Sequence, residues 1–472
     1  MLRATLALPL LLLGLVTSAV HLPLPSGARK DATVLILGGG VAGVTAARTL
    51  HEQGIDDFII IEARDELGGR LMSHSFGAPS RKFAVELGAN WVQGTQTGNG
   101  AENPIWALAK KHNVTTRSSE YFGSISTYDD SGASDFRDIF DASIEDFHKL
   151  VASAVCAVIG GRVPKRLVDM SARGGYSLTG SHPESKHQMA SEYYQFDWEF
   201  GTTPEETSWL ASSWAHNYTF DPASGGFSYE NLLSVDQRGF KTLIQAEARE
   251  SLNPAQVRLN STVSEINSSK HGVKVTLTDG HVLRADYALC TFSLGVLQHS
   301  DVKFVPPLPA WKREAIHSMS MGTYTKIFLQ FPEKFWFDTE GDFSKRIESL
   351  PDSYVQSEVM DVLQMMFPEV DVPEPTDFYF QRWHSDPLFR GSYSNWPAAF
   401  LSEHQGNLRA NVDERLWFAG EATSRKYFGY LHGAYTEGEA IGQTLAECIQ
   451  GGGCFGLEHI DRVQNARPYD II

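Results

Sequence analysis

Hydrophobic positions early in the chain form two short runs on either side of a segment with helical composition. Residues 34–37 are β-branched and aliphatic, residues 41–53 suit a helix, and residues 58–61 form a second apolar run. Short continuous apolar runs of this kind are typical of strands that are buried on both faces. The pattern therefore predicts a parallel βαβ unit in the first part of the chain.

Further strands are predicted in the second half of the chain, where apolar and polar positions alternate. An Asp-Gly turn at Asp279 separates two of these strands, and the last strand is followed by a long helical segment. The apolar pattern of the last strand also predicts that the chain returns there to the sheet of the first unit. The predicted strands are residues 257–266, 273–279, 282–290, 325–331 and 416–418.

The middle of the chain shows a different pattern. Residues 135–159 have the amphipathic periodicity of a helix, whereas residues 163–190 are polar and predict an irregular surface segment. The full length of 472 residues is too large for one simple core, so two or three domains are expected.

A glycine pattern marks the junction between the first predicted strand and the helix. Gly38, Gly40 and Gly43 have the spacing G-x-G-x-x-G, and Glu62 ends the second predicted strand. In a dinucleotide site the first glycine allows a tight turn, the second lets the backbone approach a pyrophosphate, and the third lets helix and strand pack closely. The acidic residue then accepts a hydrogen bond from a ribose hydroxyl, so this unit predicts a bound dinucleotide.

Composition and charge narrow the class of partner. The chain is 42% hydrophobic and 21% charged, which is ordinary for a globular protein. Its formal net charge is −17 and it has no concentrated basic patch, so a nucleic-acid partner is not expected. An acidic field of this kind raises the local concentration of cationic small molecules.

The N-terminus has the pattern of a secretory signal peptide. Arg3 precedes the apolar residues 6–16, and small residues follow near Ala19. The apolar run is too short to span a bilayer, so we expect cleavage after residues 1–19 and no stable membrane anchor. The expected location is secreted, in the extracellular space or the cell wall.

N-glycosylation sequons and cysteines are also relevant to the prediction that the protein is secreted. Candidate N-glycosylation sites are Asn113, Asn217, Asn260 and Asn267. With four cysteines the fold is not expected to depend on disulfides, although Cys448 and Cys454 could close a small loop. Cys290 lies in an apolar run and is expected to be a buried thiol. The cysteines and histidines do not have zinc-site spacing, so no metal is expected.

Four separated blocks of sequence resemble the flavin-containing amine oxidases, and most of all a secreted polyamine oxidase. The blocks occur in the family's order over most of the chain, and residues 125–230 match the family least. The blocks are residues 34–70, which end in Leu-Gly-Gly-Arg, residues 86–92, residues 285–297 with 324–328, and residues 418–421 with 429–435.

The resemblance implies an α/β fold with two domains that are both discontinuous in sequence. A Rossmann-like domain would bind FAD, and a second domain with a mixed sheet flanked by helices would bind the substrate. The expected segments are 30–125, 230–305 and 405–456 for the FAD-binding domain, and 126–229 and 306–404 for the substrate-binding domain.

The resemblance also assigns residues to the cofactor. Arg70 would meet the pyrophosphate, Glu421 the ribityl chain, and a helix that begins near Leu431 would point its positive end toward the flavin. Monoamine oxidases attach the flavin to a cysteine, but residues 421–425 contain none, so non-covalent FAD is expected. The residues assigned to the cofactor are Gly38, Gly40, Ala42, Gly43, Glu62, Arg70, Gly88, Ala89, Asn90, Trp91, Val263, Glu421, Tyr430 and Leu431.

Catalytic and substrate residues follow from the same resemblance. Lys326 matches a lysine that lies near flavin N5 and assists reoxidation by oxygen, although a lysine in this strand pattern is otherwise usually solvated. Trp396 and Tyr430 would be catalytic and line the substrate side of the flavin. Gln93 stands where the family members that the chain most resembles have glutamate, and Glu199 and Asp197 are expected to supply acidity to the substrate site instead.

The expected reaction is oxidation of a polyamine of the spermine and spermidine class by hydride transfer to flavin N5. An aminoaldehyde, a shorter amine and hydrogen peroxide would be formed, with molecular oxygen as acceptor. We expect a small cationic amine as substrate and a monomer or weak dimer. The sequence leaves open which polyamine is used, which carbon is oxidised and whether the substrate is acetylated.

Three alternatives are disfavoured by particular residues. An L-amino-acid oxidase needs an arginine for the substrate carboxylate soon after the second block, where Asn90-Trp91-Val92 stands instead. A monoamine oxidase is disfavoured by the absent cysteine and by the signal peptide. A non-catalytic secreted glycoprotein would not be expected to retain Lys326 and Tyr430.

Overall fold

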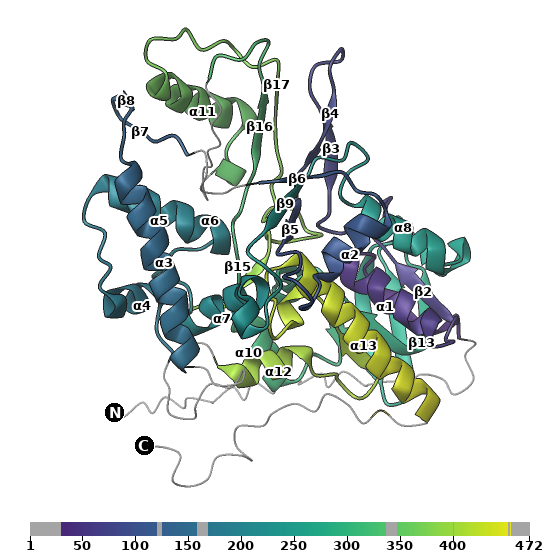
Figure 1. The fold of residues 1–472 in the computed structure, drawn as a ribbon. Coiled ribbons are helices and arrows are strands. Elements are labelled where there is room, and N and C mark those ends of the chain that lie inside the picture. Colours follow the sequence, from purple (N-terminus) through teal and green to yellow (C-terminus); the bar gives the residue numbers. More distant parts are fainter. Residues whose placement is uncertain are drawn as a thin grey trace, which may run out of the picture.

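The computed structural model describes residues 30–119, 125–157, 169–336, 347–399, 401–451 and residue 454. The predicted signal peptide, residues 1–19, lies outside these described residues. Helices from the middle of the chain gather on one side of the molecule, and the N- and C-terminal segments form the other side with a large sheet (Figure 1).

The predicted βαβ unit is confirmed. Strand β1 (Ala32–Leu37) leads into helix α1 (Val41–Glu52) and then into strand β2 (Phe58–Ile61). The two strands are parallel, with Val34 opposite Phe58. Their side chains are almost entirely buried, which explains why both runs are continuously apolar rather than alternating.

The same sheet collects strands from distant parts of the sequence. Its order is β10-β2-β1-β13-β12-β11-β14, and β19 also pairs with β13 in parallel. The C-terminal part of the chain therefore returns to the first unit, as predicted. The added strands are β10 (Val257–Arg258), β11 (Val263–Ser269), β12 (Gly272–Leu277), β13 (Val282–Cys290), β14 (Lys303–Val305) and β19 (Leu416–Phe418).

Helix α13 (Leu431–Gly451) lies beside α1 over this sheet (Figure 1). Glycines allow the close approach, because a Cβ atom at Gly438 would lie 2.4 Å from the carbonyl oxygen of Ala42. Gly442 is similarly close to Ala46. Substitution of either glycine would force the two helices apart.

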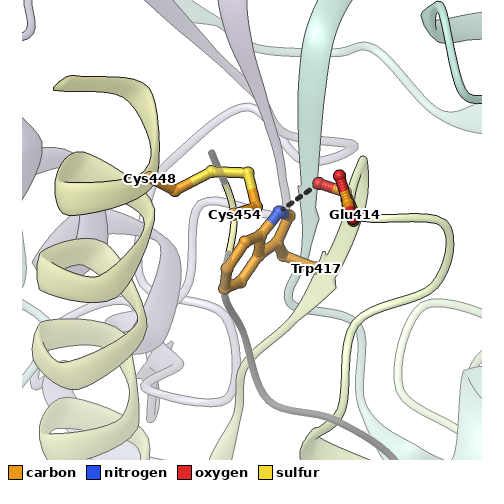
Figure 2. Close-up of a disulfide and its surroundings, with 4 residues drawn as sticks. All are labelled: Glu414, Trp417, Cys448 and Cys454. Atoms are coloured by element: carbon orange, nitrogen blue, oxygen red, sulfur yellow. Dashed lines mark hydrogen bonds between the residues drawn. A yellow bond between two sulfur atoms is a disulfide. The ribbon is translucent and has the colours of Figure 1, made fainter. Parts of the chain in front are cut away.

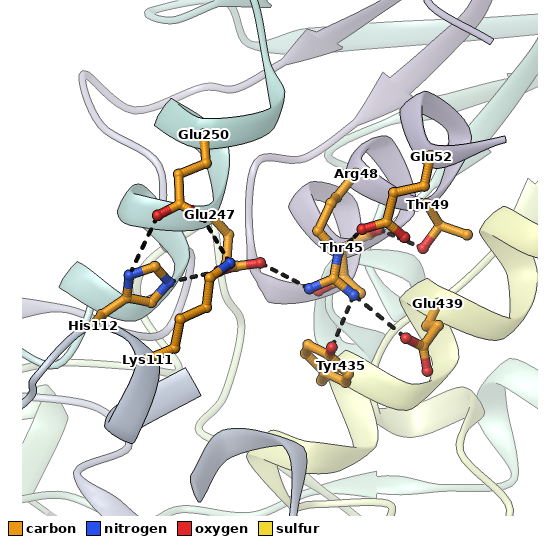
Figure 3. Close-up of polar contacts among 10 residues, drawn as sticks. All are labelled: Thr45, Arg48, Thr49, Glu52, Lys111, His112, Glu247, Glu250, Tyr435 and Glu439. Carbon is orange, nitrogen blue, oxygen red and sulfur yellow. Dashed lines mark hydrogen bonds and ion pairs between the residues drawn. The ribbon is translucent and has the colours of Figure 1, made fainter. Parts of the chain in front are cut away.

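A polar network joins this helix pair to α2 (Pro104–Lys111) and α8 (Thr242–Ser251), as Figure 3 shows. Arg48 of α1 donates to Glu247 at 2.8 Å and to the Tyr435 hydroxyl at 2.8 Å. Glu247 also accepts from Lys111 and His112, both at 2.5 Å. Several opposite charges thus hold the helices on this face of the sheet in one arrangement.

Residues 137–220 are mainly helical. Helix α3 (Arg137–Ala157) confirms the predicted amphipathic helix. The prediction of an irregular segment over residues 163–190 is wrong for the part that is described, because α4 (Ala172–Thr179) and α5 (Lys186–Gln195) form there. Both are polar helices of eight to ten residues, started by serine caps, so their buried faces are too short to give a clear periodic pattern.

The remaining strands form short ladders beyond the large sheet. The β16–β17 ladder carries α11 (Asp352–Met366) on a projecting arm (Figure 1). The ladders are β3 (Ser73–Phe76) with β4 (Phe83–Glu86), β5 (Trp91–Gln93) with β9 (Asn231–Ser234) and β6 (Thr116–Ser118), β7 (Tyr128–Asp129) with β8 (Gly132–Ala133), β15 (Ser320–Met321) with β18 (Ser394–Asn395), and β16 (Ile327–Gln330) with β17 (Asp377–Phe380).

The two-domain α/β fold class is confirmed, while the exact division into domains stays a prediction. The other helices are α6 (Asp197–Phe200), α7 (Trp209–Phe220), α9 (Leu294–Gln298), α10 (Ala310–His317), α12 (Ser402–Arg409) and four 3₁₀ turns at Pro222–Ser224, Pro254–Gln256, Ile347–Ser349 and Glu421–Thr423.

Two of the cysteine predictions are confirmed. Cys448 near the end of α13 forms a disulfide with Cys454, beside Trp417 (Figure 2). The Trp417 indole N–H donates to the carbonyl oxygen of Glu414 at 3.1 Å. Cys290 is a buried free thiol, and burial raises its pKa to about 12.

The four sequons differ in accessibility. Asn113 and Asn260 are exposed, and Asn267 is half-buried in β11. Asn217 is 9% exposed and its side-chain amide donates to the carbonyl oxygen of Val151, so the fold leaves this sequon the least accessible of the four, and glycosylation at all four stays a prediction. Among the described helices, none combines the length and the apolar composition needed to cross a bilayer.

Candidate active site

A deep cavity extends from the glycine-rich turn after β1 to the beginning of α13. Segments from both sides of the molecule contribute to it, including residues 198–200 of α6 and residues 383–395 around β18. Since sites of small ligands are usually concave and mostly apolar with a few polar groups, this cavity is the candidate active site.

The nucleotide end of the cavity is built by the βαβ unit. Gly38 has a φ of +110°, which favours glycine, and a Cβ at Gly43 would lie 2.0 Å from the Gly38 carbonyl oxygen. Gly43 does not line the cavity, and its absence of a side chain lets α1 pack on β1, as predicted. Glu62 is buried and accepts from the backbone N–H of Gly39 at 2.7 Å.

Positive charge faces the same end. The first turn of α1 has no acidic residue, and its residues Val41 and Ala42 line the cavity. Arg64 and Arg70 line it as well. Unpaired backbone N–H groups at a helix start and nearby guanidinium groups are the donors that a pyrophosphate requires, so these residues fit a dinucleotide.

Arg70 and Glu421 are in direct contact. The Arg70 guanidinium donates to Glu421 Oε1 at 2.9 Å and to the Ser392 carbonyl oxygen at 2.9 Å. Glu421 also accepts from the backbone N–H groups of Ser394 at 3.2 Å and Gly429 at 2.8 Å. This buried carboxylate therefore joins the turn at Arg70, strand β18 and the loop before α13.

Lys326 lies on the cavity wall, just before β16. Its Nζ donates to the Gly88 carbonyl oxygen at 2.6 Å, to Asn90 Oδ1 at 2.8 Å and to the Glu86 carbonyl oxygen at 3.2 Å. The lysine is thus half-buried and hydrogen-bonded to the second sequence block, rather than on the solvated face of an edge strand.

Two tyrosines and a carboxylate meet in the cavity. The Tyr430 hydroxyl donates to Glu199 Oε1 at 2.7 Å, and the Tyr393 hydroxyl donates to the Glu199 carbonyl oxygen at 3.1 Å. Burial raises the pKa of the Glu199 carboxyl, and the hydrogen bond from Tyr430 opposes this effect. Gln93 lines the same cavity.

The prediction that Trp396 lines the substrate side is wrong. Trp396 is 1% exposed, packs edge-on against Phe428, and is not part of the cavity wall. Tyr393 and Asn395 line the cavity instead. Residues 392–395 all line the cavity, and the chain turns Trp396, the next residue, into the core.

The structure brings most of the predicted site residues together, whereas their individual roles stay predictions. Sequence reasoning missed Arg64, Tyr324 and Tyr393, and no periodic pattern marked Tyr393, since residues 392–395 all line the cavity. The predicted residues that line the cavity are Gly38, Gly40, Ala42, Glu62, Arg70, Gly88, Ala89, Asn90, Trp91, Gln93, Glu199, Val263, Lys326, Glu421, Tyr430 and Leu431.

Comparison with known proteins identifies the family. The model of the flavin-containing amine oxidoreductases matches residues 41–345 and 337–443. The chain belongs to this family. It is an FAD-dependent amine oxidase, and its cavity residues fit the phosphates and ribose of that cofactor.

Plant relatives of this amine oxidase cover most of its length. Polyamine oxidase 6 of Oryza sativa subsp. japonica is 34% identical, over 88% of this chain and 91% of its own length. Polyamine oxidase 7 of the same plant is 33% identical over 86% of this chain and 93% of its own length. Polyamine oxidase 1 of Zea mays is 33% identical over 88% of this chain and 91% of its own length.

Proposed function

We propose that this amine oxidase oxidises polyamines of the spermine and spermidine class, giving an aminoaldehyde, a shorter amine and hydrogen peroxide. The observation that carries the proposal is the contact between Tyr430 and Glu199 in the cavity that also contains Lys326. An acid beside aromatic rings suits a substrate with methylene groups and a cationic end. The names of the plant relatives support the same substrate class.

The residues of the cavity have distinct tasks in this proposal. When bound, FAD would supply the hydride acceptor and the redox centre that reacts with oxygen. Tyr393 and Tyr430 flank the methylene chain and orient the reacting carbon. Glu199 binds a remote ammonium group of the substrate, since its second carboxylate oxygen can accept a charge-assisted hydrogen bond while Tyr430 occupies the first.

Lys326 has an electrostatic task in the same proposal. Its amino group donates to three oxygen atoms, so in this arrangement it does not accept a proton from the substrate. We propose that its positive charge favours the reaction of the reduced enzyme with oxygen, where negative charge develops.

A peroxide assay on purified enzyme tests the substrate. Spermine, spermidine, tyramine and leucine should be compared, and we expect peroxide from one or both polyamines, at rates well above those with tyramine and leucine. Peroxide from leucine alone, or from none of the four, would contradict the proposal. Mass spectrometry of the aldehyde would then identify the oxidised carbon.

We also propose that FAD is bound without a covalent link, because residues 421–425 of the loop before α13 contain no cysteine. Denaturation in acid should release all yellow colour from the protein. Colour that stays on the precipitated chain would show a covalent link.

Secretion is proposed from the N-terminal pattern of residues 1–19. The Cys448–Cys454 disulfide supports it, because disulfides persist mainly in oxidising compartments. N-terminal sequencing of protein collected from the culture medium should find a start near residue 20. Recovery of the intact leader inside the cell would contradict this proposal.

A further inference from the structure

The amino group of Lys326 is bound by one short segment of the FAD-binding side. Its three acceptors are the carbonyl oxygens of Glu86 and Gly88 and the side-chain oxygen of Asn90. An ammonium group has three N–H donors and no acceptor, so it matches three oxygens. A neutral amine would turn its lone pair toward one of these oxygens, and the site therefore favours the charged form.

This segment is itself firmly held. The Glu86 carboxylate accepts from the Phe240 N–H at 2.7 Å, and the Asn90 carbonyl oxygen accepts from the Ser234 N–H at 2.8 Å. A Cβ at Gly88 would lie 1.7 Å from the Arg70 carbonyl oxygen, so the backbone packs directly against Arg70. The backbone that carries the three oxygens is thus held by contacts that do not involve the lysine.

We propose that Asn90 is a positioning residue for the oxidase reaction, and that its side-chain oxygen holds the Lys326 ammonium at the cavity wall. The inference rests on the proposed function for the role of Lys326 itself. Asn90 is the one side chain among the three acceptors that a substitution can remove, because the other two are carbonyl oxygens. Its amide carries no net charge, so it fixes the ammonium without neutralising it.

Other charged groups surround this pair. The Glu86 carboxylate interacts electrostatically with both Lys326 and Lys241. Arg70 and its partner Glu421 line the same cavity. A substitution at Asn90 leaves each of these groups in place. A change in the pKa of Lys326 in such a variant therefore measures the effect of the Asn90 contact.

Two substitutions at this position should shift that titration in opposite directions. Asn90→Leu removes an acceptor of the charged form at nearly constant volume, so the pKa of Lys326 should fall by about one unit. Asn90→Asp supplies a carboxylate at the same place, so the pKa should rise by about one unit. A residue that merely supports the fold would not give shifts of opposite sign.

Competitive acetylation of the resting holoenzyme over a range of pH, followed by mass spectrometry, measures the pKa of Lys326 without turnover. The rate at which oxygen reoxidises the reduced enzyme should be measured over the same pH range. As the pH rises, this rate should fall at a lower pH in Asn90→Leu than in the wild type, and at a higher pH in Asn90→Asp. Asn99→Asp adds the same charge at an exposed site that is outside the sequons and the cavity wall, and it should change neither profile.

Lys326→Met separates this inference from the proposed function. If Lys326→Met reoxidises as fast as the wild type, the proposed role of Lys326 is wrong, and Asn90 is then not a positioning residue for the reaction. If Lys326→Met is slow but neither Asn90 variant shifts the Lys326 titration, only the inference about Asn90 is overturned. Should Asn90→Leu fail to fold, the upward shift in Asn90→Asp decides the question.

Discussion

At the scale of single residues, the role of a side chain in this protein depends on which neighbours form hydrogen bonds with it. Glu199 is held from two sides, by the hydroxyl of Tyr430 at its carboxylate and by the hydroxyl of Tyr393 at its backbone. One carboxylate oxygen remains for a ligand. The arrangement orients the charge toward the cavity without cancelling it.

Replacement of Glu199 should therefore affect substrate binding more than the chemical step. In Glu199→Gln the amide oxygen can still accept from Tyr430, but the charge is lost. We expect KM for the preferred polyamine to rise by about 10-fold or more with a much smaller change in kcat, since hydrogen bonds to charged groups contribute about 1.5–3 kcal/mol. Steady-state kinetics measure both constants.

The matched control is Glu205→Gln. Glu205 follows on the same segment but is 57% exposed and pairs with Arg173 away from the cavity. Its KM should stay within about twofold of the wild-type value, as is usual for surface sites. Equal KM values for Glu199→Gln and wild type would exclude Glu199 from substrate binding.

At the scale of elements, the helices over the large sheet are held by close packing and by buried charge. Glycines let α13 approach α1, and Arg48 then links α1 to α8 and α13 (Figure 3). The carboxylate of Glu247 is almost fully buried and depends on these cations. Its pKa is lowered to about 2, because the hydrogen bonds from Lys111, Arg48 and His112 outweigh the opposing effect of burial.

Removal of Arg48 should destabilise this helix group. Arg48→Met keeps the aliphatic volume but removes one of the cations that compensate Glu247, so we expect a loss of about 2–4 kcal/mol. Thermal unfolding followed by circular dichroism should show a midpoint several degrees lower.

Lys111→Met is the control within the same network. Lys111 also pairs with Glu247, but its side chain is 48% exposed, so its loss should cost less than about 1 kcal/mol. If Arg48→Met and Lys111→Met lower the midpoint equally, the burial of Arg48 is not what makes its contact important.

At the scale of the whole molecule, buried histidines make stability depend on pH. Burial lowers the pKa of His216 to about 3 and that of His432 to about 3. His216 lies between the rings of Phe147 and Phe220, with ring centroids 5.0 and 4.8 Å away. Such a ring stays neutral in the folded chain and gains a proton on unfolding.

The sign of the effect follows from this difference. The pKa of each histidine is lower in the folded chain than the usual value of 6.5, so its stabilising contribution is complete above pH 6.5 and is lost as the pH falls toward 3. Each buried histidine should make the free energy of unfolding about 2 kcal/mol smaller at pH 5 than at pH 7.

His216→Phe should reduce this loss, because phenylalanine fills the same space and does not titrate. We expect the difference in melting temperature between pH 7 and pH 5 to be smaller in His216→Phe than in the wild type. His281→Phe, at a site that is 69% exposed, should leave the difference unchanged. A wild-type melting temperature that does not change between pH 7 and pH 5 would show that these histidines do not control acid stability.

Sequence and structure contributed differently to the site. The βαβ unit, its glycines and Glu62 were predictable, because their spacing follows from local backbone geometry and from residues close together in the chain. The contacts of Lys326 were not predictable, since Asn90 lies 236 residues away in the sequence. The helices in residues 172–195 were missed because polar helices with short buried faces lack a clear periodicity.

The sequence by itself was enough to predict the cofactor site, the resemblance to the flavin-containing amine oxidases and the parallel βαβ unit at the start of the large sheet. Only the tertiary structure decided which aromatic side chain lines the cavity, because Tyr393 and Trp396 lie three residues apart in one segment and packing places Tyr393 at the cavity and Trp396 in the core. It also decided that Asn217 is buried and that Glu199 meets Tyr430, 231 residues away. Local spacing specifies backbone conformation, whereas burial and long-range pairing arise only when the segments pack together.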